Sequence, residues 1–177
     1  MIRCFCFLCF LCFLSSCYKK PPLIEYHQNK KKLELLISEL NTFFVDSTKN
    51  SSKISNFYSD DFLFHSFPVN FKKGVITNKT DYINSFNLMK NNGMSLSIDH
   101  CIYLPGLDQK SFIIDGSVRL YYGATMCLDT NCAEFSGYQT INFLENKILA
   151  AWEWADYGGV QLELSNRNIV ISLSISY

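Results

Sequence analysis

The chain contains 177 residues, of which 48% are hydrophobic, 15% aromatic and 18% charged. This composition excludes extended disorder, and the length suits one globular domain. The 16 basic residues balance the 16 acidic residues, so the sequence lacks the basic surface with which most DNA- and RNA-binding proteins contact phosphates. We therefore expect no nucleic-acid partner.

The first 16 residues have the layout of a secretory signal. A short positive start ending at Arg3 precedes an unbroken run of Cys, Phe and Leu over residues 4–14, which is too short to span a bilayer as a permanent helix. The next residues, Leu14-Ser15-Ser16-Cys17, resemble a bacterial lipobox, whose cysteine is acylated and becomes the new N-terminus. This resemblance implies an exported lipoprotein, anchored through Cys17 in a membrane of the cell envelope and facing the periplasm or the cell surface. The alternative is a plain signal peptide with a cysteine near its cleavage site.

The rest of the chain divides into three sections. Residues 17–29 form the lipidated N-terminus and a tether, residues 30–164 the folded domain, and residues 165–177 a tail or an extra edge strand. The tether prediction depends on Lys19-Lys20-Pro21-Pro22, because paired prolines favour an extended backbone.

The first half of the domain is predominantly helical. Residues 30–45 place apolar side chains at helical spacing, at Leu33, Leu36, Ile37, Leu40 and Phe44. A short helix around Ile54 and a strand at residues 62–67 follow. Gly74 and Thr77-Asn78 interrupt the chain, and a third helix begins at Thr80-Asp81 and ends near Asn91.

From Met94 onward the apolar residues alternate with polar ones, which is typical of strands. The predicted strands span residues 94–104, 111–127, 132–144 and 148–157, the first ending at Pro105-Gly106. Gly116 and Gly137 lie within strands, where glycine often marks a bulge or a bend. The predicted fold class is therefore α+β, with N-terminal helices packed on a strongly curved antiparallel sheet.

Cys127 and Cys132 flank residues 128–131, a plausible hairpin loop that would place the two cysteines opposite each other. An exported protein permits a disulfide there, but directly cross-strand disulfides are geometrically demanding. Both the bonded and the unbonded forms remain open at this stage. Cys101 is interpreted as a small buried hydrophobic residue.

Three short motifs in this order resemble the nuclear-transport-factor-2-like superfamily, including its SnoaL-like branch. They are Tyr58-Ser59-Asp60-Asp61-Phe62, Phe143-Leu144-Glu145-Asn146-Lys147-Ile148 and Trp152-Glu153-Trp154-Ala155-Asp156-Tyr157. The resemblance covers residues 30–164 and implies a cone-shaped domain with an internal cavity. Asp60 and Asp61 are most simply a solvated pair at the junction between helix and strand.

The resemblance also implies positions for chemistry. The carboxylate that acts as a base in steroid-isomerase-like relatives corresponds to Ser66, which is not basic near neutral pH. The neighbouring His65 could act as a base if its ring faced the cavity. The alternative is a histidine that is hydrogen-bonded at the rim of the strand.

Asp156 is the second candidate, because its position resembles the aspartate that SnoaL-like cyclases use as an acid/base. A carboxyl group in an aromatic-walled cavity has the raised pKa that a general acid needs. The alternative role is a cap for the turn at Tyr157-Gly158-Gly159, since Asp is common in turns.

Aromatic side chains and one amide complete the candidate ligand site. They are Trp152, Trp154, Tyr121, Tyr122, Tyr138 and Gln139. They would line an apolar pocket whose hydroxyl and amide groups orient a small apolar ligand. The alternatives are core packing and contact with a second subunit in a homodimer.

No cofactor motif and no metal-ligand spacing is present, since His27, His65 and His100 are scattered. Three hypotheses remain. The first is a lipid-anchored, non-catalytic domain that binds a small molecule or a protein at the cell envelope. The second is a SnoaL-like isomerase, cyclase or hydrolase that uses Asp156, with His65 assisting. The third is a structural domain whose interior is filled by side chains and whose sheet face forms a dimer.

Overall fold

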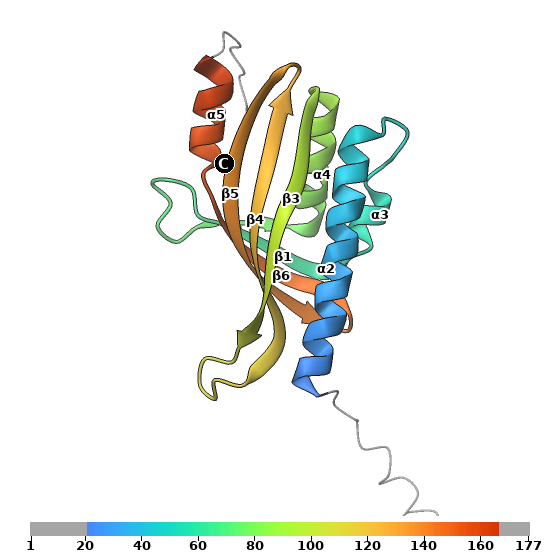
Figure 1. Ribbon diagram of the computed structural model, residues 1–177, viewed down its shortest axis with the longest axis vertical. Helices are drawn as coiled ribbons and strands as arrows, with labels where there is room; N and C mark the ends of the chain where they lie inside the picture. Colours follow the sequence, from blue (N-terminus) through green and yellow to red (C-terminus); the bar gives the residue numbers. More distant parts are fainter. Residues whose placement is uncertain (1–20, 167–177) are drawn as a thin grey trace, which may run out of the picture.

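The computed structural model describes residues 21–166, shown with their element labels in Figure 1. In chain order the elements are α2 (Pro22–Val45), α3 (Ser52–Ser55), β1 (Tyr58–Ser66), β2 (Val75–Asn78), α4 (Lys79–Asn91), β3 (Met94–Leu107), β4 (Ile114–Leu128), β5 (Asn131–Leu144), β6 (Lys147–Ala155) and α5 (Tyr157–Asn166). The predicted signal peptide, Cys17 and the tail beyond Asn166 lie outside the described residues.

Six strands form one sheet in the order β2-β1-β6-β5-β4-β3. Neighbouring strands run antiparallel except β1 and β6, which pair in parallel. The sheet is strongly curved, and α2 and α4 lie against it (Figure 1). The predicted α+β architecture, with N-terminal helices packed on a curved and mainly antiparallel sheet, is confirmed.

Helix α2 begins at Pro22, eight residues before the predicted start at Lys30. Proline suits the first helical turn, because the amide hydrogen that it lacks would have no partner there. Tyr26 and Asn29 are buried and extend the buried side of the helix towards its N-terminus. The predicted tether is therefore helical from Pro22 onward. The polar residues at 27–32 obscured this pattern, because a helix needs only one apolar side to dock.

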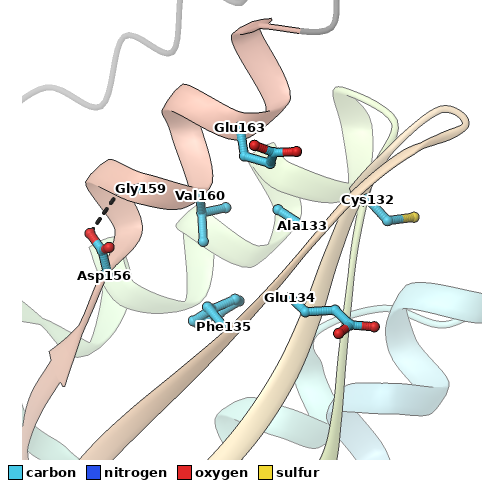
Figure 2. A pocket seen from close by; sticks show the side chains of 8 residues that line it. All are labelled: Cys132, Ala133, Glu134, Phe135, Asp156, Gly159, Val160 and Glu163. Atoms are coloured by element: carbon cyan, nitrogen blue, oxygen red, sulfur yellow. Dashed lines mark hydrogen bonds between the residues drawn. The ribbon is translucent and has the colours of Figure 1, made fainter.

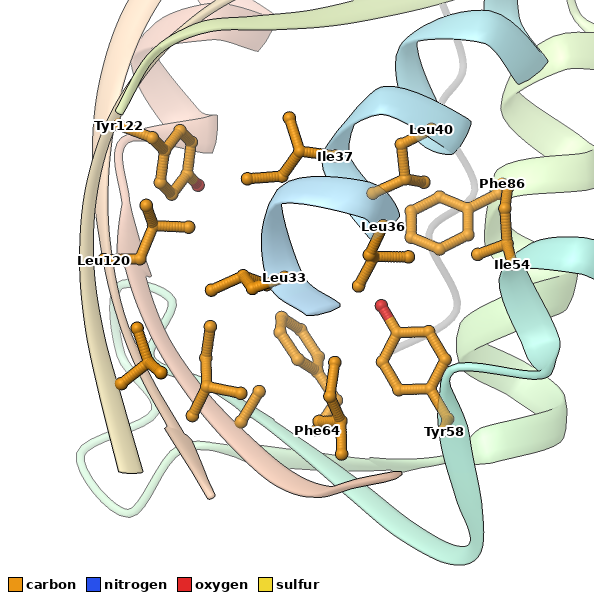
Figure 3. Close-up of a cluster of buried hydrophobic side chains, with 14 of the residues drawn as sticks. Leu33, Leu36, Ile37, Leu40, Ile54, Tyr58, Phe64, Phe86, Leu120 and Tyr122 are labelled. Atoms are coloured by element: carbon orange, nitrogen blue, oxygen red, sulfur yellow. The ribbon is translucent and has the colours of Figure 1, made fainter. Parts of the chain in front are cut away.

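One hydrophobic cluster occupies the space between α2 and the sheet (Figure 3). Leucine and isoleucine side chains of α2 lie among residues of α3, β1, α4 and β4, and the labelled members are Leu33, Leu36, Ile37, Leu40, Ile54, Tyr58, Phe64, Phe86, Leu120 and Tyr122. Side chains thus fill the part of the cone where the sequence resemblance implied a cavity, and this packing is the main source of the domain's stability.

A side-chain amide joins α2 to an irregular position in β3. Asn41 Nδ2 donates to the carbonyl oxygen of Ile98 at 2.7 Å, and Asn41 Oδ1 accepts from the Ile98 amide at 2.9 Å. The pairing of β3 with β4 shifts register between Ile98 and His100. Asn41 therefore satisfies backbone groups next to the shift and fixes the helix against this strand.

Several other elements differ from the prediction. Strand β1 begins at Tyr58 instead of residue 62, and β4 begins at Ile114 instead of residue 111. Strand β6 ends at Ala155, and Tyr157, predicted as its last residue, begins α5. Strand β3 continues through Pro105 to Leu107, which is tolerated because β3 is an edge strand with a register shift at this point. The short strand β2 follows Gly74 and was not predicted, since four residues carry little periodic signal.

Strands β4 and β5 meet in a tight turn at Asp129-Thr130. Cys127 and Cys132 are direct partners across this hairpin and form a disulfide with a Cα–Cα distance of 4.1 Å. The bonded alternative is the one that the structure contains. Cys101 is a free thiol, half-buried against the main hydrophobic cluster.

The two strand glycines permit close approaches. Gly116 has φ of +81°, and a Cβ there would lie 2.8 Å from the Glu25 side chain of α2. At Gly137 a Cβ would collide with the ring of Tyr122. Glycine is therefore required at both positions, the first for its backbone conformation and the second for space.

Candidate functional site

A buried carboxyl group lies on the inner side of the sheet at Glu153 of β6, whose residue is 4% exposed. Its Oε1 accepts hydrogen bonds from the Tyr122 hydroxyl at 2.7 Å and from Gln139 Nε2 at 2.5 Å. Its Oε2 accepts a bond from the Tyr157 hydroxyl at 2.9 Å. Three neutral donors thus satisfy a group that would be costly to bury alone.

Strand register brings these four side chains together. Gln139 and Glu153 are direct partners in the pairing of β5 with β6, so their side chains share one face. Tyr122 reaches the same face from β4 by lying over Gly137. Tyr157 opens α5 and returns its hydroxyl to the strand that the chain has just left.

The tyrosines around Glu153 hold their protons. Burial raises the pKa of Tyr122 and Tyr157, and the negative charge of Glu153 raises both pKa values further. Burial also raises the pKa of Tyr58 and Tyr82, with a contribution in the same direction from Glu153. These hydroxyls therefore remain hydrogen-bond donors at neutral pH.

Ser66, the position at which the sequence resemblance implied a missing base, lies beside this carboxyl group. Ser66 and Glu153 are partners in the parallel pairing of β1 with β6. Glu153 thus supplies a carboxyl group on the strand adjacent to Ser66.

The predicted aromatic pocket is not in the interior. Trp152 and Trp154 alternate with the buried Glu153 along β6, so they lie on the opposite face of the sheet. Tyr121 pairs with Tyr138, and Tyr138 pairs with Trp154, in the strand register. Of the predicted ligand-binding side chains, Gln139 and Tyr122 contact the inner carboxyl group.

We call the opposite face the outer sheet face. Its side chains form two rows across the sheet, and they are Ile102, Tyr121, Tyr138 and Trp154 in one row and Leu104, Arg119, Thr140, Trp152, His65 and Ile76 in the other. Ring contacts join neighbours within the first row, with centroids 4.7 Å apart for Tyr121 and Tyr138 and 5.8 Å apart for Tyr138 and Trp154. The outer sheet face is thus rich in aromatic surface.

His65 and Asp156, the two predicted acid/base residues, are not brought together. The His65 ring stacks on Trp152 on the outer sheet face, with centroids 4.9 Å apart and planes 12° apart. Asp156 precedes α5, where its Oδ1 accepts from the Gly159 amide at 2.8 Å and its carbonyl oxygen accepts from the Val160 amide at 3.1 Å. The contacts of Asp156 therefore agree with the alternative role, in which its side chain caps the turn. Asp60, interpreted as part of a solvated pair, also forms an ion pair with Lys79 at 2.8 Å.

Side chains of the described residues line two surface hollows. One, of about 560 Å³, lies between α5 and β5 (Figure 2), and its lining residues include Ala133, Phe135, Asp156 and Val160. The other, of about 430 Å³, lies beside Phe67, Phe71, Lys72 and Trp154. Glu153 lines neither hollow.

Glu153 was missed because the two tryptophans suggested that their own face of β6 was the interior. A signal was available in the same strand. Ala151, Glu153 and Ala155 alternate with Trp152 and Trp154, and small residues on one face suit a surface that other side chains cover, as they do at Ala151. The face with the small residues is the inner one, and its carboxyl group is the buried one.

Other kinds of site are absent from residues 21–166. Within them, no three His, Cys, Asp or Glu side chains gather as a metal site would require. No helix in this part of the chain is both long and apolar enough to cross a membrane.

In comparisons with protein-family profiles and with curated proteins, the sequence matches none. Solved structures with the same fold include BvnE pinacolase from Penicillium brevicompactum, at 12% identity and a TM-score of 0.60, over 80% of this chain and 94% of that one. A candidate polyketide cyclase from Xanthomonas campestris pv. campestris matches at 8% identity and a TM-score of 0.59, over 79% of this chain and 98% of that one. AusH from Aspergillus nidulans matches at 13% identity and a TM-score of 0.57, over 74% and 85%. At these identities the likeness establishes the fold alone, which is the predicted cone of N-terminal helices packed on a curved, mainly antiparallel sheet.

Proposed function

We propose that the chain is an exported, lipid-anchored domain that acts through contacts with protein at the cell envelope and not through chemistry in its interior. The contact surface is the outer sheet face, and its first partner is a second copy of the chain. The observation that carries this proposal is the exposure of large apolar side chains on that face.

Six of these side chains are between 42% and 60% exposed, and they are Leu63, Ile76, Ile102, Leu104, Tyr121 and Trp154. They come from β1, β2, β3, β4 and β6 of one sheet. Tyr138 of β5 joins Tyr121 to Trp154 through ring contacts, so these side chains form a continuous surface and not scattered single residues. Continuous apolar patches on a folded domain usually mark a contact site. Tyrosine and tryptophan are also the residues that most often dominate the energy of protein interfaces.

The interior offers less for a ligand. Side chains of α2 fill the space against the sheet, and the buried carboxyl group already has three donors. A ligand would have to displace these groups before it could bind. The packed interior therefore favours the third hypothesis of the sequence over small-molecule binding.

Sequence and structure support the anchorage. The lipobox-like residues end at Cys17, five residues before α2 begins. The disulfide between Cys127 and Cys132 is of the kind that persists in oxidising compartments outside the cytoplasm. Metabolic labelling with radioactive palmitate in a bacterial host tests the anchor, with Cys17→Ala as the variant and Cys12→Ala as its control. We expect label in the wild type and in C12A and none in C17A, and equal label in all three would overturn the anchorage.

Sedimentation of the detergent-solubilised full chain tests the contact surface. We expect the wild type to have the mass of a dimer and Trp154→Ser to shift it towards the monomer. Val45→Ser is the control, because Val45 is 87% exposed but lies at the end of α2 and away from the sheet. A monomeric wild type, or equal masses for all three proteins, would contradict the proposal.

Catalysis is a second candidate function, and the position of Glu153 beside Ser66 favours it. Two proteins of the same fold are named for reactions on small organic molecules, a pinacolase and a candidate polyketide cyclase. The carboxyl group of Glu153 would then act as the acid/base, with the Tyr122 and Tyr157 hydroxyls polarising a substrate oxygen. Turnover of a ketone or polyketide-like substrate that is lost in Glu153→Gln and retained in Asp156→Asn would establish this function. If the wild type turned over no substrate in such a panel, catalysis would be excluded for these substrates and the proposed contact with protein would remain.

A further inference from the structure

We infer that one end of the domain lies in the surface of the lipid bilayer. This end, here called the apolar tip, consists of Leu23 and Ile24 at the start of α2 and of Leu107, Phe112 and Ile113 around the β3–β4 loop. The inference deepens the proposed function and rests on the proposed anchorage through Cys17.

The apolar tip exposes unusually large hydrophobic side chains. All five residues are between 46% and 75% exposed, and Phe112 is the most exposed of them. Phe112 and Ile113 are adjacent in the loop between β3 and β4, and both are exposed. Exposed aromatic and aliphatic residues at a loop end are suited to the boundary between headgroups and acyl chains.

The loop is held in one shape and does not simply fray. Asp108 Oδ1 accepts hydrogen bonds from the amides of Lys110 and Ser111 at 3.1 and 2.8 Å, and from the Ser111 hydroxyl at 2.8 Å. The Asp108 amide donates to the Ile113 carbonyl oxygen, and the Phe112 amide donates to the Asp108 carbonyl oxygen, both at 2.9 Å. Phe112 has φ of +57°, which is costly for a bulky residue and points to a functional reason.

The start of α2 lies at the same end of the molecule. The Glu25 side chain packs over Gly116, and Asn29 Nδ2 donates to the Gly116 carbonyl oxygen at 2.9 Å. Gly116 lies two residues beyond Ile114, which pairs with Leu107 at the base of the loop. Figure 1 shows the first turn of α2 and the β3–β4 loop together at the lower end of the long axis.

The length and charge of the chain that precedes α2 favour a bilayer as the partner. Only residues 18–21 separate the acylated Cys17 from Pro22, and the five residue steps from Cys17 to Pro22 span at most about 17 Å when fully extended. The apolar tip therefore cannot be far from the lipid headgroups. Lys19 and Lys20 precede the helix and Lys110 lies in the loop, which suits a surface of anionic lipids.

Lipid quenching of an introduced tryptophan tests the inference. The full chain is produced in a bacterial host that processes it, and the mature protein is reconstituted into phosphatidylethanolamine and phosphatidylglycerol vesicles with or without brominated acyl chains. The test variant is Phe112→Trp. The control is Val45→Trp, because Val45 is exposed at the opposite end of α2, about 36 Å away along the helix. The wild-type signal of Trp152 and Trp154 is subtracted from both.

We expect brominated lipids to reduce the fluorescence of the tryptophan in F112W by about half, since quenching requires contact with the acyl chains, and to leave that of V45W unchanged. No quenching in F112W, or equal quenching in both variants, would overturn the inference. A blue-shifted F112W without vesicles would also overturn it, because the tip would then be covered by protein. The intact mass of the same sample shows whether Cys17 is acylated. A chain that is not acylated is thereby distinguished from an acylated chain whose apolar tip does not enter the bilayer.

Discussion

The Tyr122 hydroxyl donates a hydrogen bond to Oε1 of Glu153 at 2.7 Å, between two side chains that are each at most 5% exposed. The two residues are 31 positions apart in the sequence and come from strands separated by β5. This bond connects β4 to β6, the last strand in the chain order of the sheet, across β5.

We expect Glu153→Gln to lower the free energy of unfolding by about 2 kcal/mol, because an amide group cannot accept all three donors and leaves one unpaired. Tyr122→Phe should cost about 1 kcal/mol, since it removes a single hydrogen bond. Urea unfolding of the two variants and of the double variant measures both values. A double variant that costs the sum of the two would show that the residues do not interact, contrary to the structure.

Stability should decline at alkaline pH. Burial raises the pKa of Tyr58, Tyr82, Tyr122 and Tyr157 above the ordinary value of 10.0. Between the unfolded and the folded pKa the folded state holds more protons, so the free energy of unfolding falls as the pH rises through and above about 10. We expect little change between pH 7 and 9 and a steep loss by pH 11 in urea titrations. Tyr82→Phe should make the loss shallower, and an equal slope in this variant would contradict the assignment.

Asp156 caps α5, so two substitutions should separate this role from acid/base chemistry. Asp156→Asn keeps an oxygen that can accept from the Gly159 amide, and we expect its stability to stay within a few tenths of a kcal/mol of the wild type. Asp156→Ala removes the acceptor and should cost about 1 kcal/mol. Thermal unfolding monitored by circular dichroism compares the two. Equal losses in both variants would exclude the capping role.

The disulfide at the β4–β5 turn should stabilise the hairpin by restricting the unfolded chain. For a loop of this size the chain-entropy estimate is about 2 kcal/mol. The double variant Cys127→Ser with Cys132→Ser should lose this amount, and a reducing agent should destabilise the wild type but not the double variant. If the reducing agent also destabilises the double variant, the loss of stability does not come from this disulfide.

Much of the fold could be predicted from the sequence, because the periodic patterns were long. Apolar spacing predicted the long helix α2, the alternation after Met94 predicted the sheet, and Gly116 and Gly137 indicated its curvature. Short or polar elements were not recognised in the sequence, and β2 and the first turns of α2 are the examples. At Asp156 the choice between strand end and helix cap depended on the two glycines that follow, and glycines weaken any helix signal.

The candidate site was harder, because alternation shows which residues share a face but not which face is inside. The pattern placed Trp152 and Trp154 together and Glu153 opposite them. Because the larger side chains were assigned to the interior, the predicted inner and outer faces of β6 were exchanged. The apolar tip was also hidden, since Phe112 and Ile113 resemble the start of a strand in sequence. Only the folded loop shows that they are exposed.

Oxidative footprinting of the full chain tests the central claim most directly, because it reports whether the outer sheet face is covered in solution. Hydroxyl-radical labelling is measured by mass spectrometry at low and at high protein concentration. We predict that Trp154 and Tyr121 are labelled several-fold more slowly at high concentration, while Leu162, which is 62% exposed on α5, keeps its rate. Equal labelling of Trp154 and Tyr121 at both concentrations, in a chain that sediments as a monomer, would contradict the account.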